Sequence, residues 1–183
     1  MSTAMRVTVV IVNYGTANLV ISCLESLEGE RQQLPGLKAI VVDNASTDDS
    51  ASILSQRLSG PDFVEWVEFM PLAINGGFGW GNNQAIQRAL QSEDGPDAIL
   101  LLNPDARIQP GAVVALVSDM ARHDDAASVG SQLVNEDGSL SGSAFRFPTI
   151  GREWVRGHGL GILARLFRIA PTSMPFGYSG PAE

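Results

Sequence analysis

Two carboxylates of this chain stand where chemistry is expected, directly after apolar runs. Asp43 follows LKAIVV and Asp105 follows LLNP. A carboxylate at the end of a buried strand can accept a hydrogen bond from a base N–H, or ligate a hard cation that bridges two phosphates. Taken singly, each is explained equally well as a turn residue, because aspartate is common at turns. Polar or glycine-rich segments with this placement are residues 13–15, 43–46, 75–83 and 103–105.

The elements that must position these segments alternate between strand and helix. Apolar, β-branched runs predict strands at residues 6–12, 37–42, 64–69, 98–102 and 127–133. Helical spacing of apolar residues predicts helices at residues 16–27, 46–58, 78–90 and 110–123. This alternation indicates an α/β fold, with a mostly parallel sheet and helices on both faces. Ligands of such folds bind at the carboxyl ends of the strands, so the polar segments should meet there.

Three residues are predicted to set helix boundaries. Gly29 is expected to stop the first helix. Ser46 is expected to cap the second, and Pro110 to occupy the first position of the last.

Composition excludes several classes of protein. The chain has 183 residues, 44% of them hydrophobic, with a net charge of −8, which excludes a disordered acidic chain and argues against a nucleic-acid partner. Cys23 is the single cysteine, and His123 and His158 are the two histidines, so a cysteine zinc site and a histidine-rich metal site are excluded. No apolar run approaches the roughly 18 residues of a membrane span, and the N-terminus is typical of a first strand. We therefore expect a cytoplasmic protein.

The glycine-rich segment at residues 75–83 has three interpretations. Its glycines allow backbone to approach a ligand closely, and the helix that follows offers a positive N-terminus to phosphate. A dinucleotide-binding fingerprint is disfavoured, because Asn82 stands where its third glycine belongs and the segment does not follow the first strand. Alternatively, the glycines allow tight packing of the turn, with Phe78 and Trp80 as core anchors.

Together the segments resemble the family 2 glycosyltransferases, over about residues 5–148. The matching stretches are VVIVNYGTANLVISCLESL, IVVDNASTDDS, NGGFGWGNNQAI and LLNPDARIQPGAV, in the family's order and spacing. The NPD version is most similar to the rhamnosyltransferase-like branch. The resemblance implies a Rossmann-like, A-type glycosyltransferase architecture. It also implies transfer of a sugar from a UDP- or dTDP-sugar to a lipid- or polysaccharide-linked acceptor, as in cell-wall or polysaccharide biosynthesis.

The resemblance implies a role for each matching residue of the nucleotide site. Asn13 and Tyr14 would line the base and ribose, and Asp43 would accept from the imide N–H of uracil or thymine. The other nucleotide-binding residues that it implies are Asn44, Ser46, Gly76, Gly77, Asn82, Asn83 and Asn103.

The resemblance also implies a metal site. Asn103 and Asp105 occupy the family's Asp-x-Asp motif, and Asp105 would ligate Mg²⁺ or Mn²⁺ held by the donor's diphosphate. Asn103 replaces the first carboxylate of the motif, so the site loses one negative charge but keeps a carbonyl oxygen.

The sequence divides into a nucleotide-sugar-binding α/β domain, residues 1–148, and a basic amphipathic tail, residues 149–183. The tail's pattern indicates either contact with the inner face of an anionic membrane or a helix that covers the sheet, and the sequence leaves both open.

The catalytic base is missing from the pattern. The resemblance implies a later Glu-Asp pair whose aspartate acts as base, and nothing in residues 141–183 supplies it. We therefore expect a chain truncated after its donor-binding half, with the tail as an incomplete remainder and its activity an open question. The alternatives are a non-catalytic nucleotide-sugar-binding or docking module, and an unrelated nucleotide-binding α/β enzyme.

Overall fold

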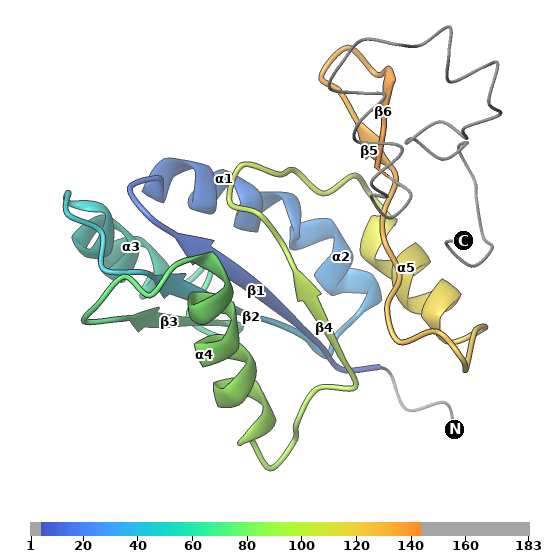
Figure 1. The fold of residues 1–183 in the computed structure, drawn as a ribbon, viewed down its shortest axis with the longest axis horizontal. Coiled ribbons are helices and arrows are strands. Elements are labelled where there is room, and N and C mark those ends of the chain that lie inside the picture. The colour runs from blue at the N-terminus through green and yellow to red at the C-terminus, as the bar shows by residue number, and fades with distance from the viewer. Residues whose placement is uncertain (1–4, 144–183) are drawn as a thin grey trace, which may run out of the picture. The chain divides into compact units, whose positions relative to one another are not determined.

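The computed structural model describes residues 5–143, which belong to two compact units divided after Asp124 (Figure 1). The first unit contains a four-stranded parallel sheet with the strand order β3-β2-β1-β4. Its strands are β1 (Val7–Asn13), β2 (Leu37–Asp43), β3 (Val67–Pro71) and β4 (Ala98–Leu101). The predicted α/β class and parallel sheet are confirmed.

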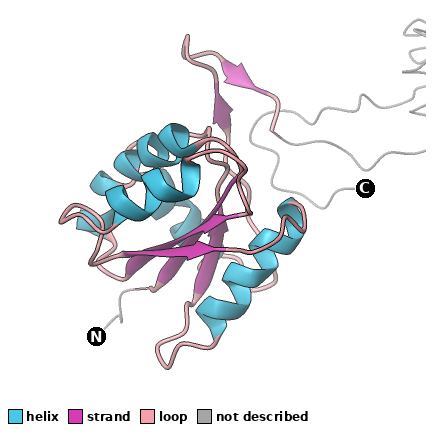
Figure 2. Cartoon of the chain, turned by 90° about the vertical axis from the view of Figure 1, so that its left-hand side faces the viewer, coloured by secondary structure: helices cyan, strands magenta, loops and turns pink. Residues whose placement is uncertain are grey.

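Helices cover both faces of this sheet (Figure 2). They are α1 (Ala17–Ser26), α2 (Glu28–Gln33), α3 (Ser50–Leu58), α4 (Phe78–Leu90) and α5 (Ala112–Met120). On one face Val9 and Ile11 of β1 pack with residues of α1, α3 and α5, while on the other Val10 and Val12 pack with α4. Because β1 is buried on both faces, its sequence is a continuous apolar run without alternation.

The predicted fifth strand at residues 127–133 is wrong. Residues 127–132 form no strand, and β5 (Leu133–Val134) instead pairs antiparallel with β6 (Leu140–Ser141). The predicted run has few apolar residues, whereas Asp137-Gly138 provides a strong turn signal, with Gly138 at φ 80°. The second unit, as far as it is described, therefore contains a small hairpin.

The three predicted helix boundaries are also wrong. Gly29 lies inside α2, which continues from Leu27 directly after α1. Ser46 precedes α3 by four residues, because its side chain is bonded elsewhere, as described below. Pro110 is not the first residue of α5, which begins at Ala112. It precedes Gly111, whose left-handed conformation (φ 81°) ends the loop ahead of the helix.

Other boundaries follow the prediction more closely. The helix predicted at residues 78–90 is confirmed as α4. The third strand starts at Val67 and not at Val64, because residues 61–66 form turns in which the Trp66 indole donates to the Asp62 carbonyl oxygen. The basic tail, with its predicted membrane contact, lies outside the described residues.

Candidate functional site

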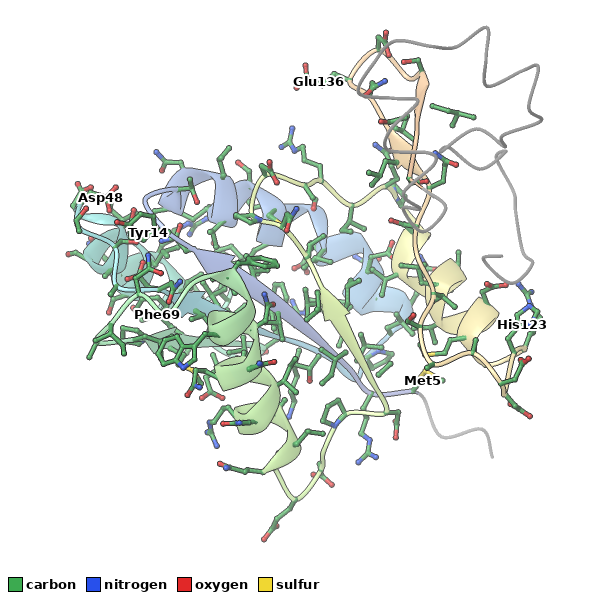
Figure 3. All side chains as sticks on the ribbon, viewed as in Figure 1. Met5, Tyr14, Asp48, Phe69, His123 and Glu136 are labelled. Atoms are coloured by element: carbon green, nitrogen blue, oxygen red, sulfur yellow. The ribbon has the colours of Figure 1, made fainter. Side chains whose placement is uncertain are left out.

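The strand register brings the predicted segments to one edge of the sheet. Asn13 lies beside Asp43, and Asp43 lies beside Pro71, so β1, β2 and β3 end level with one another. On the other side of β1, the N–H of Leu102 donates to the carbonyl oxygen of Val10 at 2.9 Å, immediately after β4 ends. In Figure 3 Tyr14 and Asp48 lie together at this end of the sheet. The prediction that the polar segments meet at the carboxyl ends is confirmed.

Buried Asn13 and Asp43 form a hydrogen-bond network with partly buried Ser46 where β1 and β2 end. Asp43 Oδ1 accepts from Asn13 Nδ2 at 2.7 Å and from Ser46 Oγ at 2.6 Å, while Oδ2 accepts from the Ser46 N–H at 3.0 Å. Asn13 and Asp43 are 0% and 2% exposed. A fully bonded network of this kind fixes the loops that it joins.

The same network orders the start of α1. Asn13 Oδ1 accepts from the Thr16 N–H and Oγ1 at 3.0 and 2.9 Å, and Ser46 Oγ accepts from the Gly15 N–H at 2.9 Å. The loops after β1 and β2 are thus tied together, and Tyr14, in the first of them, has half of its surface exposed.

Asn44 connects β2 to the start of α4 and carries an unpaired buried oxygen. Its Nδ2 donates at 2.8 Å to Asn75 Oδ1, which also accepts from the Gly77 N–H at 2.9 Å. Asn44 is 3% exposed, and within residues 5–143 its Oδ1 is the buried side-chain atom that has no hydrogen-bond partner. An unsatisfied buried acceptor costs about 1–3 kcal/mol. The described residues therefore supply no donor for this oxygen.

The glycines before and within α4 serve different purposes. A Cβ on Gly76 would collide with the Trp80 indole, and one on Gly81 would lie 3.0 Å from Val12 Cγ1. Gly77 has φ +87°, which favours glycine. Packing and backbone conformation therefore account for these three. Gly79 faces open space, so the fold itself does not require a glycine there.

The remaining residues of this segment divide between buried and exposed. Phe78 is 54% exposed, so its interpretation as a core anchor is wrong: as the first residue of α4 it precedes the buried stripe that starts at Gly81. Asn82 is 4% exposed and donates through Nδ2 to the Phe78 carbonyl oxygen at 2.9 Å. Asn83 is exposed.

Asn103 and Asp105 lie in the loop between β4 and α5, and both are exposed. The Asn103 carbonyl oxygen accepts from the Ala106 N–H at 3.1 Å and lies 3.6 Å from Cys23 Sγ. Burial, assisted by the nearby negative charge of Asp105, raises the pKa of the Cys23 thiol to about 12. Cys23 is therefore an unreactive core residue beneath this loop.

The donor set at this loop fits a cation that arrives with a ligand. Within the described residues, no group of three or more His, Cys, Asp or Glu could hold a metal ion. A cation such as Mg²⁺ is commonly bound through one or two carboxylates together with substrate phosphates, and keeps several waters. Asp105, with Asn103 two residues earlier in the same loop, is compatible with that kind of coordination.

A cavity of about 250 Å³ lies at the opposite, amino-terminal ends of the strands. Thr8, Lys38 and Arg88 contribute to its lining, and none of the predicted site residues does. This cavity therefore does not mark the candidate site, which is identified instead by its hydrogen-bond network. Within residues 5–143, no helix is long and apolar enough to cross a membrane.

Comparison with known proteins gives matches along most of the chain. The model of the family "Glycosyl transferase family 2" matches residues 8–170. N-acetylglucosaminyl-diphospho-decaprenol L-rhamnosyltransferase of Mycobacterium tuberculosis (strain CDC 1551 / Oshkosh) is 27% identical over 122 residues, covering 63% of this chain. The chain spans 38% of the length of that relative.

Solved structures share the fold at low sequence identity. The mannosyltransferase PcManGT from Pyrobaculum calidifontis, in complex with GDP-Man and Mn²⁺, has a TM-score of 0.58 and 21% identity, covering 73% of this chain and 37% of its own. S. aureus TarS 1-349 in complex with UDP has a TM-score of 0.53 and 19% identity, covering 72% and 40%. The parallel sheet and these likenesses show an A-type glycosyltransferase fold. With the family model matched from residue 8 to residue 170, the chain belongs to glycosyl transferase family 2.

Proposed function

We propose that this chain is the donor-binding part of a glycosyltransferase that uses a UDP- or dTDP-sugar and a lipid- or polysaccharide-linked acceptor. The observation that carries the proposal is the unpaired, buried Asn44 Oδ1 beside the bonded Asn13–Asp43–Ser46 network. Both lie at the carboxyl edge, where parallel α/β sheets bind ligands. The names of the relatives support it: one is a rhamnosyltransferase, and solved relatives hold GDP-Man or UDP.

The base would be recognised by the acceptors of Asp43 and Asn44. Uracil and thymine present one imide N–H, which needs an acceptor. Asp43 already accepts three hydrogen bonds, which leaves about one of its roughly four acceptor positions, whereas Asn44 Oδ1 has no partner. The original assignment of the imide to Asp43 stays a prediction. Asn44 is its direct competitor, and mutation distinguishes the two.

The rest of the nucleotide would lie between the loops that this network fixes. Tyr14 would pack against the base or ribose. The first turn of α4 has N–H groups without helical partners, and the open space at Gly79 allows a ligand close to them. Gly76 and Gly77 would shape this approach to the N–H groups. Asn83 would contact the ligand from its exposed position. Asn82 would act indirectly, through its hydrogen bond to the Phe78 carbonyl oxygen in the first turn of α4.

Asp105 would hold Mg²⁺ or Mn²⁺ with the oxygens of the diphosphate, and Asn103 would offer a carbonyl oxygen. The cation would supply charge neutralisation for the diphosphate as a leaving group. Its exposed position suits this role, because the remaining ligands come from the substrate and from water.

The test is calorimetric titration with UDP, dTDP, GDP and ADP, each with and without Mn²⁺. We expect UDP or dTDP to bind most tightly and Mn²⁺ to strengthen binding of the diphosphate. If Asn44 and not Asp43 accepts the imide N–H, Asn44→Leu should weaken uridine binding about ten-fold, the equivalent of one charge-free hydrogen bond of about 1.4 kcal/mol. If Asp43 accepts it, Asn44→Leu should bind uridine as the parent does. Asp97→Asn, an exposed change just before β4 and so at the opposite edge, is the matched control. Equal affinity for all four nucleotides would contradict the proposal.

A further inference from the structure

Glu30 of α2 is a buried acid that contacts the main chain of α5. It is 1% exposed, and its carboxylate accepts from the N–H groups of Gly111, Val113 and Val114, the last two at 2.9 and 3.2 Å. Gly111 precedes α5 and has no side chain with which to cap it. Glu30 therefore satisfies the free N–H groups of α5 from 81 residues earlier in the chain, and its charge suits the positive end of the helix.

Two more side chains fasten the loop that ends at α5. Ser26 Oγ accepts from the Ile108 N–H at 2.9 Å and donates to the Cys23 carbonyl oxygen at 2.6 Å. Cys23 Sγ lies 3.6 Å from the Asn103 carbonyl oxygen. The loop thus runs along α1 and α2 before it reaches α5, as Figure 1 also shows.

This loop carries Asn103 and Asp105, and the Asp105 side chain makes no hydrogen bond within the described residues. The loop backbone therefore sets the position of the Asp105 carboxylate. That backbone is fixed where Leu102 bonds to Val10, at Ile108 where Ser26 accepts its N–H, and where Glu30 holds the N-terminus of α5.

We infer that Glu30 is a positioning residue for metal binding at Asp105, an inference that rests on the proposed function. Three N–H groups converge on the two carboxylate oxygens of Glu30. In Glu30→Gln one of those oxygens becomes an NH₂ group, which would face N–H donors and release part of the cap. The loop would then keep its attachments at Leu102 and Ile108 but lose the one at α5, and the cation and diphosphate would have to order it further on binding.

Glu30→Gln and Glu28→Gln test this inference as a matched pair. Glu28 lies on the same short helix but is exposed and paired with Arg31. Calorimetry gives the affinity for UDP with and without Mn²⁺, and for uridine alone. In Glu30→Gln we expect the Mn²⁺-dependent gain in UDP affinity to fall, by at most about the ten-fold that removal of a direct partner of a metal ligand costs at its lower end. Uridine affinity should stay unchanged, and Glu28→Gln should behave as the parent.

A purely structural role predicts a different pattern, in which uridine and UDP affinities fall together; that result, or an unchanged Mn²⁺-dependent gain, overturns the inference. Asp105→Ala separates this failure from failure of the proposed function. If Asp105→Ala keeps the gain, the metal site itself is misassigned; if it loses the gain while Glu30→Gln keeps it, only the positioning role fails. Should Glu30→Gln not fold, Ser26→Ala takes its place, because it releases the loop at Ile108. Loss of the Mn²⁺-dependent gain in UDP affinity with unchanged uridine affinity would again support the inference, and any other pattern would overturn it.

Discussion

The carboxyl edge of the sheet has two sides that differ in burial. Where β1 and β2 end, Asn13, Asp43 and Asn44 are buried, and the first two are bonded to one another and to their loops. Where β4 ends, Asn103 and Asp105 are exposed. The two sides also differ in strand pairing, since β1 pairs with β2 over seven positions but with β4 over four. In the function we propose, the nucleotide side is preformed and the metal side is completed by its ligand.

The largest effect should come from breaking the preformed side with Asp43→Ala. The change leaves Asn13 Nδ2 and Ser46 without their shared acceptor, so the free energy of unfolding should fall by about 1–3 kcal/mol. Affinity for UDP or dTDP should fall roughly ten-fold or more, because a charge-assisted hydrogen bond contributes about 1.5–3 kcal/mol. Urea denaturation and calorimetry measure the two quantities.

Asp49→Ala is the control for this experiment, because Asp49 is exposed and makes no side-chain cap bond to α3. Equal stability of Asp43→Ala and the parent would mean that the network does not hold the two loops together.

On the exposed side, Asp105→Ala should act on binding and spare stability. We expect loss of the Mn²⁺-dependent part of UDP binding, unchanged binding of uridine, and a change in unfolding free energy within about 0.5 kcal/mol, as is usual for surface positions. Calorimetry with and without Mn²⁺ checks the first two expectations. Persistence of metal-enhanced binding would place the cation elsewhere, with Asp48 the next candidate.

Asn103→Asp should strengthen the metal side. A second carboxylate two residues before Asp105 adds an anionic oxygen, the ligand that hard divalent cations prefer, so the Mn²⁺-dependent gain in UDP affinity should rise several-fold. Uridine affinity is the internal reference. A gain that stays the same, or falls, would show that residue 103 does not face the cation.

The smallest effect concerns the ion pair at the opposite edge, between Arg6 and Asp97. Hydrogen bonds from Arg6 lower the pKa of Asp97 to about 2, so its contribution to stability is present above the ordinary aspartate pKa and is lost as pH falls through about 2. Asp97→Asn should therefore make the unfolding free energy less steep in pH between about 4 and 2. Urea denaturation at several pH values measures this slope, and identical slopes would show that the exposed pair does not stabilise the start of β4.

The sequence predicted the parts of this structure that depend on local pattern. The buried run of β1, the helix at Phe78–Leu90 and the meeting of four polar segments all follow from periodicity and from the geometry of parallel sheets. The capping role assigned to Ser46 failed because its hydroxyl bonds to Asp43 and Gly15 instead. Serine at a strand end signals only that some local bond is available.

Glu30 could not be found from the sequence. It lies in the polar stretch EGERQQ, which has no apolar periodicity, and charged residues are seldom fully buried unless paired. Its partners are N–H groups at Gly111, Val113 and Val114, which carry no side-chain signal. A long-range bond between a side chain and backbone becomes visible only when the elements are placed in space.

In the function we propose, a nucleoside diphosphate and a divalent cation bind side by side at the carboxyl edge. Amide NMR spectra during titration with UDP, first with Mg²⁺ and then with Mn²⁺, test it directly, because Mn²⁺ broadens signals of nearby amides. We expect shifts centred on residues 13–16, 43–46 and 75–79, and Mn²⁺ broadening centred on residues 103–107. Shifts centred instead on Thr8, Lys38 and Arg88, around the cavity at the opposite edge, would contradict it.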